Sequence, residues 1–149
     1  MVCPFCLHKK NDVYNSRSTT SGTVWRRRRC LNCGQAFTTK ESFDPSNTWK
    51  VKSTKATTPY SRAKLVISLL RACDHRINKD QATWYIFEAV EQRLLPIAAK
   101  NKLIITNKDI AATAMAILKK FDRTAYVKYM SYHQPAMDAT ALRRQLRRD

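Results

Sequence analysis

Four cysteines constrain the first part of this chain more than any other feature. They are spaced as Cys3-x-x-Cys6 and Cys30-x-x-Cys33. Two such pairs, roughly two dozen residues apart, offer four thiolates to one tetrahedral Zn²⁺, which is the pattern of a Cys₄ zinc ribbon. Two disulfides are the alternative, but C-x-x-C pairs form strained disulfides and no signal peptide indicates an oxidising compartment. A redox motif needs only one pair. The sequence therefore predicts a zinc site.

Four consecutive arginines, Arg26 to Arg29, directly precede the second cysteine pair. Side chains alternate on a strand, so Arg26 and Arg28 are expected on one face and Arg27 and Arg29 on the other. The adjacent zinc knuckle holds this strand in one orientation, and guanidinium groups suit bidentate contacts to phosphates or guanine edges. We expect these four residues and Arg17 to contact nucleic acid. A merely solvated face is the alternative, and RNA remains open as a target.

The charge of the chain supports a polyanionic partner. The 149 residues carry 28 Lys and Arg against 11 Asp and Glu, a formal net charge of +17. Such an excess favours nucleic acid, or otherwise an anionic surface or nucleotide phosphates. No apolar run is long enough to span a bilayer and no targeting segment precedes Cys3, so a cytoplasmic, nucleoid-associated protein is expected. Gly22 and Gly34 are the only glycines, which excludes P-loop and Rossmann phosphate loops.

The chain divides by composition into four parts. Residues 1–41 form the metal segment, 42–48 a linker, 49–133 a mainly helical domain, and 134–149 a basic tail. The metal segment is too short to bury an adequate core, so its folding is expected to depend on zinc. Strand character on both sides of the second cysteine pair predicts a β-hairpin with the knuckle at its turn, where Gly34 takes a positive φ.

The second domain is expected to be a short β cap followed by about four helices, which makes the whole chain α+β. Alternation over 49–52 predicts a strand, and 54–58 a second strand or a turn. Helix starts are predicted at Ser61, at Asn78, at the capping-box pair Thr106 and Asp109, and at Asp122. Pro96 is expected to end the second helix. Cys73 lies in an apolar helical pattern and is expected in the core.

These motifs resemble the NrdR family of bacterial ribonucleotide reductase regulators. The resemblance rests on three stretches of the first segment: Met1-Val2-Cys3-Pro4-Phe5-Cys6, Ser16-Arg17, and Arg26 through Gly34 followed by Phe37-Thr38-Thr39-x-Glu41. The rest resembles the second module of the family, an ATP-cone. That similarity rests on Pro59-Tyr60-x-Arg62-x-Lys64-Leu65, Leu70-Arg71-Ala72-Cys73 and Asp122-x-x-Ala125-Tyr126-Val127-Lys128-Tyr129. Together the two modules cover about residues 1–133.

The resemblance implies a repressor, without enzymatic turnover, that binds paired operator boxes in double-stranded DNA upstream of ribonucleotide reductase genes. It implies a homo-oligomer, a dimer or larger, whose assembly and DNA affinity respond to ATP and dATP. The matching residues imply zinc ligands at Cys3, Cys6, Cys30 and Cys33. The nucleotide-binding residues that we expect are Val51, Lys52, Lys55, Arg62, Lys64, Tyr126 and Lys128.

The chain departs from the family pattern in one hairpin and at two single residues. The first cone hairpin usually reads Val-x-Lys-Arg-Asp-Gly, whereas this chain has Val51-Lys52-Ser53-Thr54-Lys55. Lys55 is expected to replace the missing charge, and the tight turn must be made without glycine. Ala36 stands in place of an arginine, and Leu7 in place of a knuckle glycine.

Two other functions remain open. One is a constitutive nucleic-acid-binding zinc protein whose helical domain only oligomerises. The other is a regulatory subunit of an enzyme, which the lack of clustered catalytic residues disfavours. Surplus aromatic residues on the second predicted helix, Trp84, Tyr85 and Phe87, are expected at a subunit interface.

Overall fold

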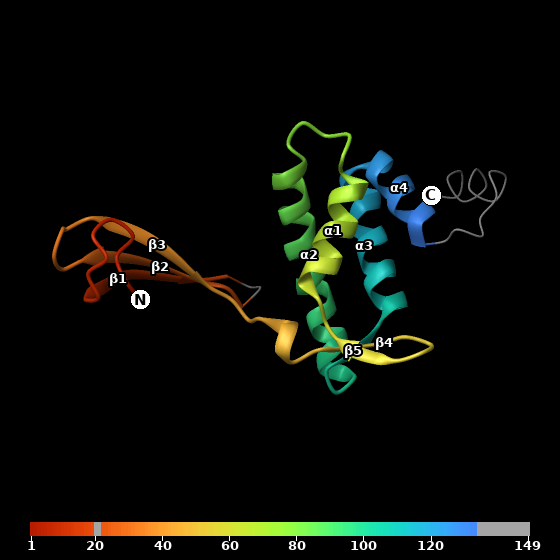
Figure 1. Cartoon of the computed structure of the whole chain (residues 1–149), viewed down its shortest axis with the longest axis horizontal. Coiled ribbons are helices and arrows are strands. Elements are labelled where there is room, and N and C mark those ends of the chain that lie inside the picture. Colours follow the sequence, from red (N-terminus) through yellow and green to blue (C-terminus); the bar gives the residue numbers. More distant parts are fainter. Residues whose placement is uncertain (20–21, 134–149) are drawn as a thin grey trace. The chain divides into compact units, whose positions relative to one another are not determined.

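The computed structural model describes residues 1–19 and 22–133, and these separate into two compact units, with the boundary between Asp44 and Pro45 (Figure 1). The predicted basic tail, 134–149, lies outside the described residues. The first unit is all-β and the second is four helices with a small sheet, so the α+β prediction is confirmed. Within the described residues, no helix combines the length and apolar character that crossing a membrane requires.

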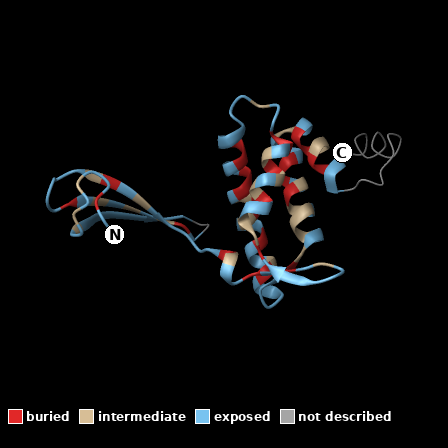
Figure 2. Ribbon diagram, viewed as in Figure 1, coloured by how far each residue is buried: buried red, intermediate tan, exposed pale blue. Residues whose placement is uncertain are grey.

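The first unit is a three-stranded antiparallel sheet in the order β1-β2-β3. Its strands are β1 (Asn11–Ser18), β2 (Val24–Cys30) and β3 (Ala36–Glu41). The predicted hairpin is β2–β3, with the second knuckle at its turn and Gly34 at φ 71°. The sequence did not predict β1, because its polar residues show no alternation. Figure 2 shows how little of this sheet is buried.

Both knuckles are closed by backbone hydrogen bonds. In the first, the N–H of Leu7 donates to the carbonyl of Cys3 and the N–H of Cys3 donates to the carbonyl of His8, both at 2.9 Å. In the second, the N–H of Gly34 donates to Cys30 at 3.1 Å. The two knuckles use the same left-handed backbone, because Leu7 has φ 59° where the second knuckle has glycine.

The second unit buries one continuous apolar core. After a 3₁₀ turn, η1 (Pro45–Asn47), its helices are α1 (Arg62–Ala72), α2 (Lys79–Lys100), α3 (Asn107–Phe121) and α4 (Arg123–His133). Large, fully buried side chains of the core include Trp49, from the segment between η1 and β4, Leu69 of α1 and Ile86 of α2. The buried positions follow the inward faces of the helices (Figure 2). Cys73 is buried, as predicted.

A small mixed sheet in the order β5-β4-β6 lies beside the helices. Its strands are β4 (Lys50–Lys52), β5 (Thr57–Pro59) and β6 (Ile104–Thr106). β4 pairs antiparallel with β5 and parallel with β6. The sequence did not predict β6, since a three-residue strand that pairs across half the domain leaves no local signal.

Local capping was predictable in this unit. Ser61 caps α1 by accepting from the N–H of Lys64, and Thr106 and Asp109 form the predicted reciprocal capping box of α3. Asn78 occupies the N-cap position of α2, but its side chain makes no capping hydrogen bond and instead accepts from the Nε of Arg76 at 3.3 Å.

The prediction that Pro96 ends α2 is wrong, because the helix continues to Lys100. Proline removes one backbone donor and crowds the preceding turn. Here Leu94 and Ala98, two residues before and two residues after Pro96, are both fully buried in the core. Packing of that face outweighs the local penalty, and Pro96 itself stays on the exposed side.

Replacing Leu7 with glycine is expected to stabilise the ribbon. Leu7 is 73% exposed, so its side chain contributes little packing, while its left-handed backbone costs about 1 kcal/mol relative to glycine. Slower zinc release to a chelator and a higher midpoint for the ribbon transition are the expected results. Lys9→Gly is the matched control: Lys9 is also exposed but not in the left-handed region, so this change is expected to destabilise. A destabilising Leu7→Gly would contradict the argument.

Candidate metal centre and nucleic-acid interface

The four cysteine sulfurs gather between the two knuckles. Those of Cys3 and Cys33 are 3.7 Å apart, those of Cys6 and Cys30 are 3.6 Å apart, and all four lie within 4.8 Å of one another. Zinc–sulfur bonds of about 2.3 Å in a tetrahedron place neighbouring sulfurs about 3.8 Å apart. The four thiols are free, so the disulfide alternative is not realised. This cluster has the geometry and the donors of a tetrahedral zinc site.

The neighbouring sulfurs shift the pKa values of Cys6 and Cys33 in opposite directions. A backbone N–H at His8, together with hydrogen bonds from Cys33, Cys30 and Asn32, lowers the pKa of Cys6 to about 6. For Cys33, a backbone N–H at Gln35 favours the thiolate, but burial and the three neighbouring sulfurs together raise its pKa to about 12. Four thiolates at this distance repel one another, so a divalent cation is needed to hold all of them ionised.

The four arginines of β2 alternate between the faces of the sheet, as predicted. On one face, Arg26 Nε donates to Glu41 Oε1 at 2.9 Å and Arg28 Nη2 contacts the same oxygen at 3.4 Å. Arg28 also donates to Thr39 at 3.0 Å. This face therefore carries a carboxylate that partly cancels its own guanidinium charge.

The opposite face has aromatic and hydroxyl partners instead. Arg27 donates to the hydroxyl of Tyr14 and to that of Thr38, both at 3.0 Å. The guanidinium of Arg29 lies over the Tyr14 ring, 5.7 Å from its centroid, and the ammonium of Lys40 lies 5.4 Å from the Trp25 ring. These groups hold the cations without neutralising them. We call this face, with Tyr14, Arg17, Trp25, Arg27, Arg29 and Lys40, the arginine–aromatic face.

Arg17 belongs to the arginine–aromatic face by strand register, because it lies opposite Trp25. Asp12, opposite Arg29, is an acidic residue on this face. Among the described residues, no carboxylate lies within ion-pair distance of Arg17, Arg27 or Arg29. Tyr14, Trp25 and Lys40 were not among the residues predicted from the sequence. Alternation along β2 would have placed Trp25 with Arg27, and the hairpin register would have added Lys40.

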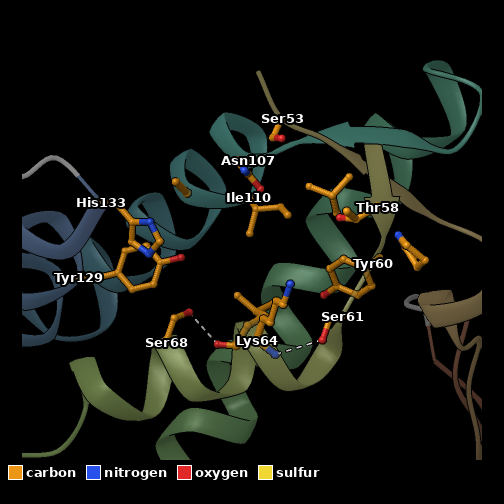
Figure 3. A pocket seen from close by; sticks show the side chains of 14 residues that line it. Ser53, Thr58, Tyr60, Ser61, Lys64, Ser68, Asn107, Ile110, Tyr129 and His133 are labelled. Carbon is orange, nitrogen blue, oxygen red and sulfur yellow. Dashed lines mark hydrogen bonds between the residues drawn. The ribbon is translucent and has the colours of Figure 1, made fainter. Parts of the chain in front are cut away.

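A cavity of about 500 Å³ opens in the second unit between the β4–β5 hairpin and three helices (Figure 3). Val51 and Ser53 border it from the hairpin, and Lys64, Asn107 and Tyr129 from α1, α3 and α4. The first turns of both α1 and α3 face it. Ser61 and Thr106 cap the N–H groups of Lys64 and Asp109, and the other first-turn N–H groups favour anions, although Asp109 places a carboxylate in the first turn of α3. Its volume is within the range of ligand pockets, about 300–1,000 Å³.

The structure brings only two of the seven predicted nucleotide-binding residues to this cavity, Val51 and Lys64. Lys52 and Lys55 lie on the hairpin, outside the lining. Arg62 holds Glu91 through two bonds, Nε–Oε1 at 2.8 Å and Nη2–Oε2 at 2.6 Å.

The other two predicted residues lie elsewhere in the helical unit. Tyr126 is part of the buried core. Lys128 pairs with Asp74 in the connection after α1. The lining also contains residues that were not predicted from the sequence, Ser68, Asn107, Tyr129 and His133, although Tyr129 follows the predicted Tyr126 by one helical turn.

The hairpin turn is made without the glycine of the family pattern. Ser53 Oγ accepts from the N–H groups of Lys55 at 3.3 Å and Ala56 at 3.1 Å, and it donates to the carbonyl of Ala56 at 2.9 Å. A serine side chain thus supplies the local hydrogen bonds that close the turn.

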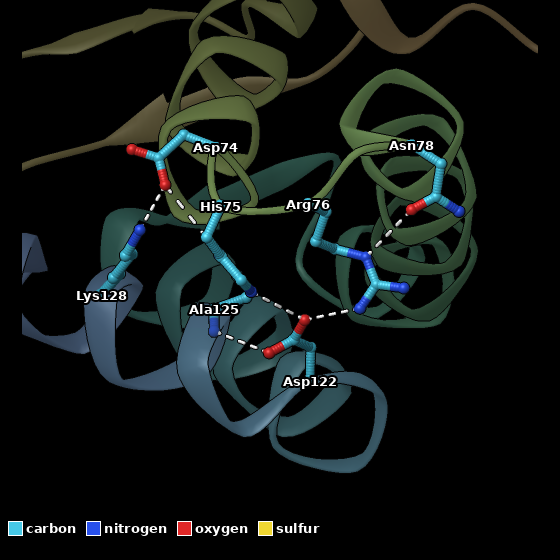
Figure 4. Close-up of polar contacts among 7 residues, drawn as sticks. All are labelled: Asp74, His75, Arg76, Asn78, Asp122, Ala125 and Lys128. Carbon is cyan, nitrogen blue, oxygen red and sulfur yellow. Dashed lines mark hydrogen bonds and ion pairs between the residues drawn. The ribbon is translucent and has the colours of Figure 1, made fainter.

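Asp122 joins the loop between α1 and α2 to the start of α4 (Figure 4). Its carboxylate accepts from Arg76 Nη1 at 2.6 Å, contacts His75 Nε2 at 3.1 Å, and caps α4 by accepting from the N–H of Ala125 at 3.0 Å. Burial alone would raise its pKa, but the Ala125 N–H, Arg76 and His75 together lower it to about 2.

Comparison with known proteins agrees with this architecture of zinc ribbon and helical unit. Residues 1–41 match the family described as "Transcriptional repressor NrdR-like, N-terminal domain". A protein of Acetivibrio thermocellus named "Transcriptional repressor NrdR" is 31% identical over 149 residues, covering 99% of this chain and 97% of that protein.

Two further relatives carry the same name. One from Dehalococcoides mccartyi is 33% identical over 144 residues, covering 97% of this chain and 80% of the relative. One from Kosmotoga olearia is 34% identical over 139 residues, covering 93% and 86%.

The ribbon, its four-cysteine cluster and these matches define a zinc-ribbon transcriptional repressor rather than an enzyme. The chain belongs to the NrdR family.

Asp122→Asn is expected to destabilise the helical unit by about 1–2 kcal/mol at neutral pH, since a charged acceptor of three bonds is lost. A depressed folded-state pKa means that the carboxylate stabilises the fold above its ordinary pKa of 3.8, and that this stability is lost as the pH falls through about 2. The gap between variant and wild type in denaturant unfolding should therefore narrow from pH 7 towards pH 2. Asp80→Asn, on the exposed first turn of α2, is the control. A gap independent of pH would contradict the assignment.

Proposed function

We propose that this protein is a zinc-dependent repressor that binds double-stranded DNA through the arginine–aromatic face of its ribbon. The observation that carries the proposal is the division of the β2 arginines. Arg26 and Arg28 share Glu41, whereas Arg17, Arg27 and Arg29 have no carboxylate partner among the described residues. Guanidinium groups without an ion-pair partner on an exposed sheet suit phosphate contact and counterion release.

Zinc holds this face in place in the proposal. Cys3, Cys6, Cys30 and Cys33 are the ligands, and Cys30 ends the strand that carries the arginines. The buried apolar cluster among the described residues of the ribbon is only Cys3, Cys30 and Phe37, with Cys6 packed against it. Such a core is too small to fold a sheet alone, so metal and DNA binding are expected to be lost together.

The expected DNA experiment compares the two faces. Arg27→Ala and Arg29→Ala should each weaken binding and reduce the salt slope by about 1 from a starting value of roughly −2 to −4 per subunit. Arg26→Ala is the matched control on the Glu41 face and should leave the slope unchanged. Fluorescence anisotropy over a salt series measures this. A mixed-sequence duplex reports the phosphate contacts, and the upstream region of a ribonucleotide reductase gene reports specificity. Chelated, zinc-free protein should not bind. Equal effects of Arg26→Ala and Arg27→Ala would refute the division of faces.

We further propose that the helical unit binds ATP and dATP in the 500 Å³ cavity and that the nucleotide changes the assembly of the repressor. Lys64 and the two helix N-termini supply the anion-binding groups. A pair of operator boxes would then be bound by ribbons from different subunits of one oligomer, with the spacing of the boxes set by the spacing of the ribbons. Trp84 and Tyr85 on α2 are 58% and 66% exposed, whereas Phe87 is buried, so the first two are the candidate contacts between subunits.

One set of contacts favours the alternative function, a constitutive DNA-binding protein whose helical unit only oligomerises. Arg62 and Lys128 are already paired with Glu91 and Asp74, which leaves fewer cations for a triphosphate. The measurement that separates the two functions is the response to nucleotide of assembly and of DNA binding.

Lys64→Ala is expected to remove most of the stabilisation that ATP or dATP gives to the helical unit. Ligand at 100 times its Kd stabilises a fold by about 2.7 kcal/mol, a shift that thermal unfolding resolves easily. Lys120→Ala, on the exposed last turn of α3 at the far end of that helix, is the matched control. Light scattering after size exclusion, run without nucleotide, with ATP and with dATP, reports assembly. No shift in midpoint or in mass with either nucleotide would leave the constitutive function.

A further inference from the structure

The first strand of the ribbon contains an irregularity at Tyr14. Along β1, Asp12 lies opposite Arg29 and Val13 opposite Arg28, but the next paired residue is Asn15, opposite Arg27. Tyr14 is therefore one extra residue in this strand. Such a β-bulge shifts the alternation of side chains by one position and re-aims the residue it inserts.

The bulge decides the face on which Arg17 lies. With it, Arg17 lies opposite Trp25, on the arginine–aromatic face. If regular pairing continued from Val13 and Arg28, Arg17 would lie opposite Val24, on the Glu41 face. A single inserted residue thus gathers Arg17, Arg27 and Arg29 on one surface.

Tyr14 itself contacts two of these arginines. Its hydroxyl accepts from Arg27 Nε at 3.0 Å, and its ring lies under the guanidinium of Arg29 at 5.7 Å. A hydroxyl group and an aromatic ring order both side chains without the countercharge that a carboxylate would bring. It is also 56% exposed, which gives it little packing role in the ribbon.

We propose that Tyr14 is a positioning residue for DNA recognition, a role that rests on the proposed function of the arginine–aromatic face. Arginine loses side-chain freedom when it contacts a phosphate or a base edge, and that loss opposes binding. Tyr14 fixes Arg27 and Arg29 before DNA arrives, so less freedom remains to be lost. The bulge and the tyrosine act together: the bulge places Tyr14 beside these arginines, and the Tyr14 side chain makes the contacts with Arg27 and Arg29.

The test measures binding of the full-length zinc protein to a mixed-sequence duplex over a salt series. Tyr14→Ala is expected to weaken binding about tenfold, because one hydrogen bond and one cation–π contact are lost. Tyr14→Phe, which keeps the ring under Arg29, is expected to weaken it about threefold. Val13→Ala removes an exposed neighbour on the Glu41 face and should stay within about twofold of wild type. Zinc content and the thermal midpoint are measured for every variant.

A double-mutant cycle separates positioning from a merely structural role. Arg29→Ala should weaken binding less in the Tyr14→Ala background than in the wild type, since Arg29 is then no longer held in place. Additive effects of the two substitutions would overturn the role of Tyr14. The same conclusion follows if Tyr14→Ala and Tyr14→Phe both bind with wild-type affinity while Arg27→Ala and Arg29→Ala bind weakly; the DNA-binding face itself would then still stand. If Tyr14→Ala loses zinc, the affinity of Tyr14→Phe decides. If Arg27→Ala and Arg29→Ala themselves bind normally, the DNA-binding face is wrong.

Discussion

The cluster of four sulfurs is the constraint on which the ribbon depends. One knuckle precedes β1 and the other connects β2 to β3, and the sulfurs within 4.8 Å of one another tie these two parts of the ribbon together. The described apolar cluster around them contains one aromatic side chain, Phe37. Because a core of that size cannot offset the conformational entropy of a three-stranded sheet, a bound metal would supply what packing does not. Because Cys30 ends β2, the number of residues between a β2 position and Cys30 decides on which face of the sheet its side chain lies.

Strand alternation then converts one run of like charges into two surfaces with different properties. On one surface Glu41 partly cancels Arg26 and Arg28 and connects β2 to β3. On the other, Tyr14, Trp25 and Thr38 hold cations through rings and hydroxyl groups. A carboxylate stabilises a guanidinium by removing part of its charge from the outside, whereas an aromatic ring does not. Arginines of one strand thus link β2 to β3 through Glu41 on one face, whereas on the other face they have no carboxylate partner among the described residues.

The helical unit divides its polar residues in a similar way between structure and cavity. Glu91 receives Arg62 and the hydroxyl of Tyr60, and Asp122 receives Arg76, so several charges near the core are already paired. The cavity is bordered instead by Lys64, by small hydroxyl side chains and by the first turns of two helices. If the cavity takes the proposed nucleotide, backbone donors would contribute more to binding its phosphates than side-chain charge.

The sequence by itself determined the features that depend on neighbours in the chain. The cysteine spacing predicts the metal cluster, the alternation of β2 predicts two arginine faces, and Ser61 and Thr106 predict helix starts, because each is a matter of a few consecutive residues. Only the tertiary structure decided the features that need a distant partner. The bulge at Tyr14 depends on the register of β1 against β2, and β6 exists only beside β4. α2 continues past Pro96 because Leu94 and Ala98 are buried in the core. Arg62 and Lys128 pair with Glu91 and Asp74 and do not line the cavity, because those carboxylates, distant in the sequence, lie within ion-pair distance in the fold.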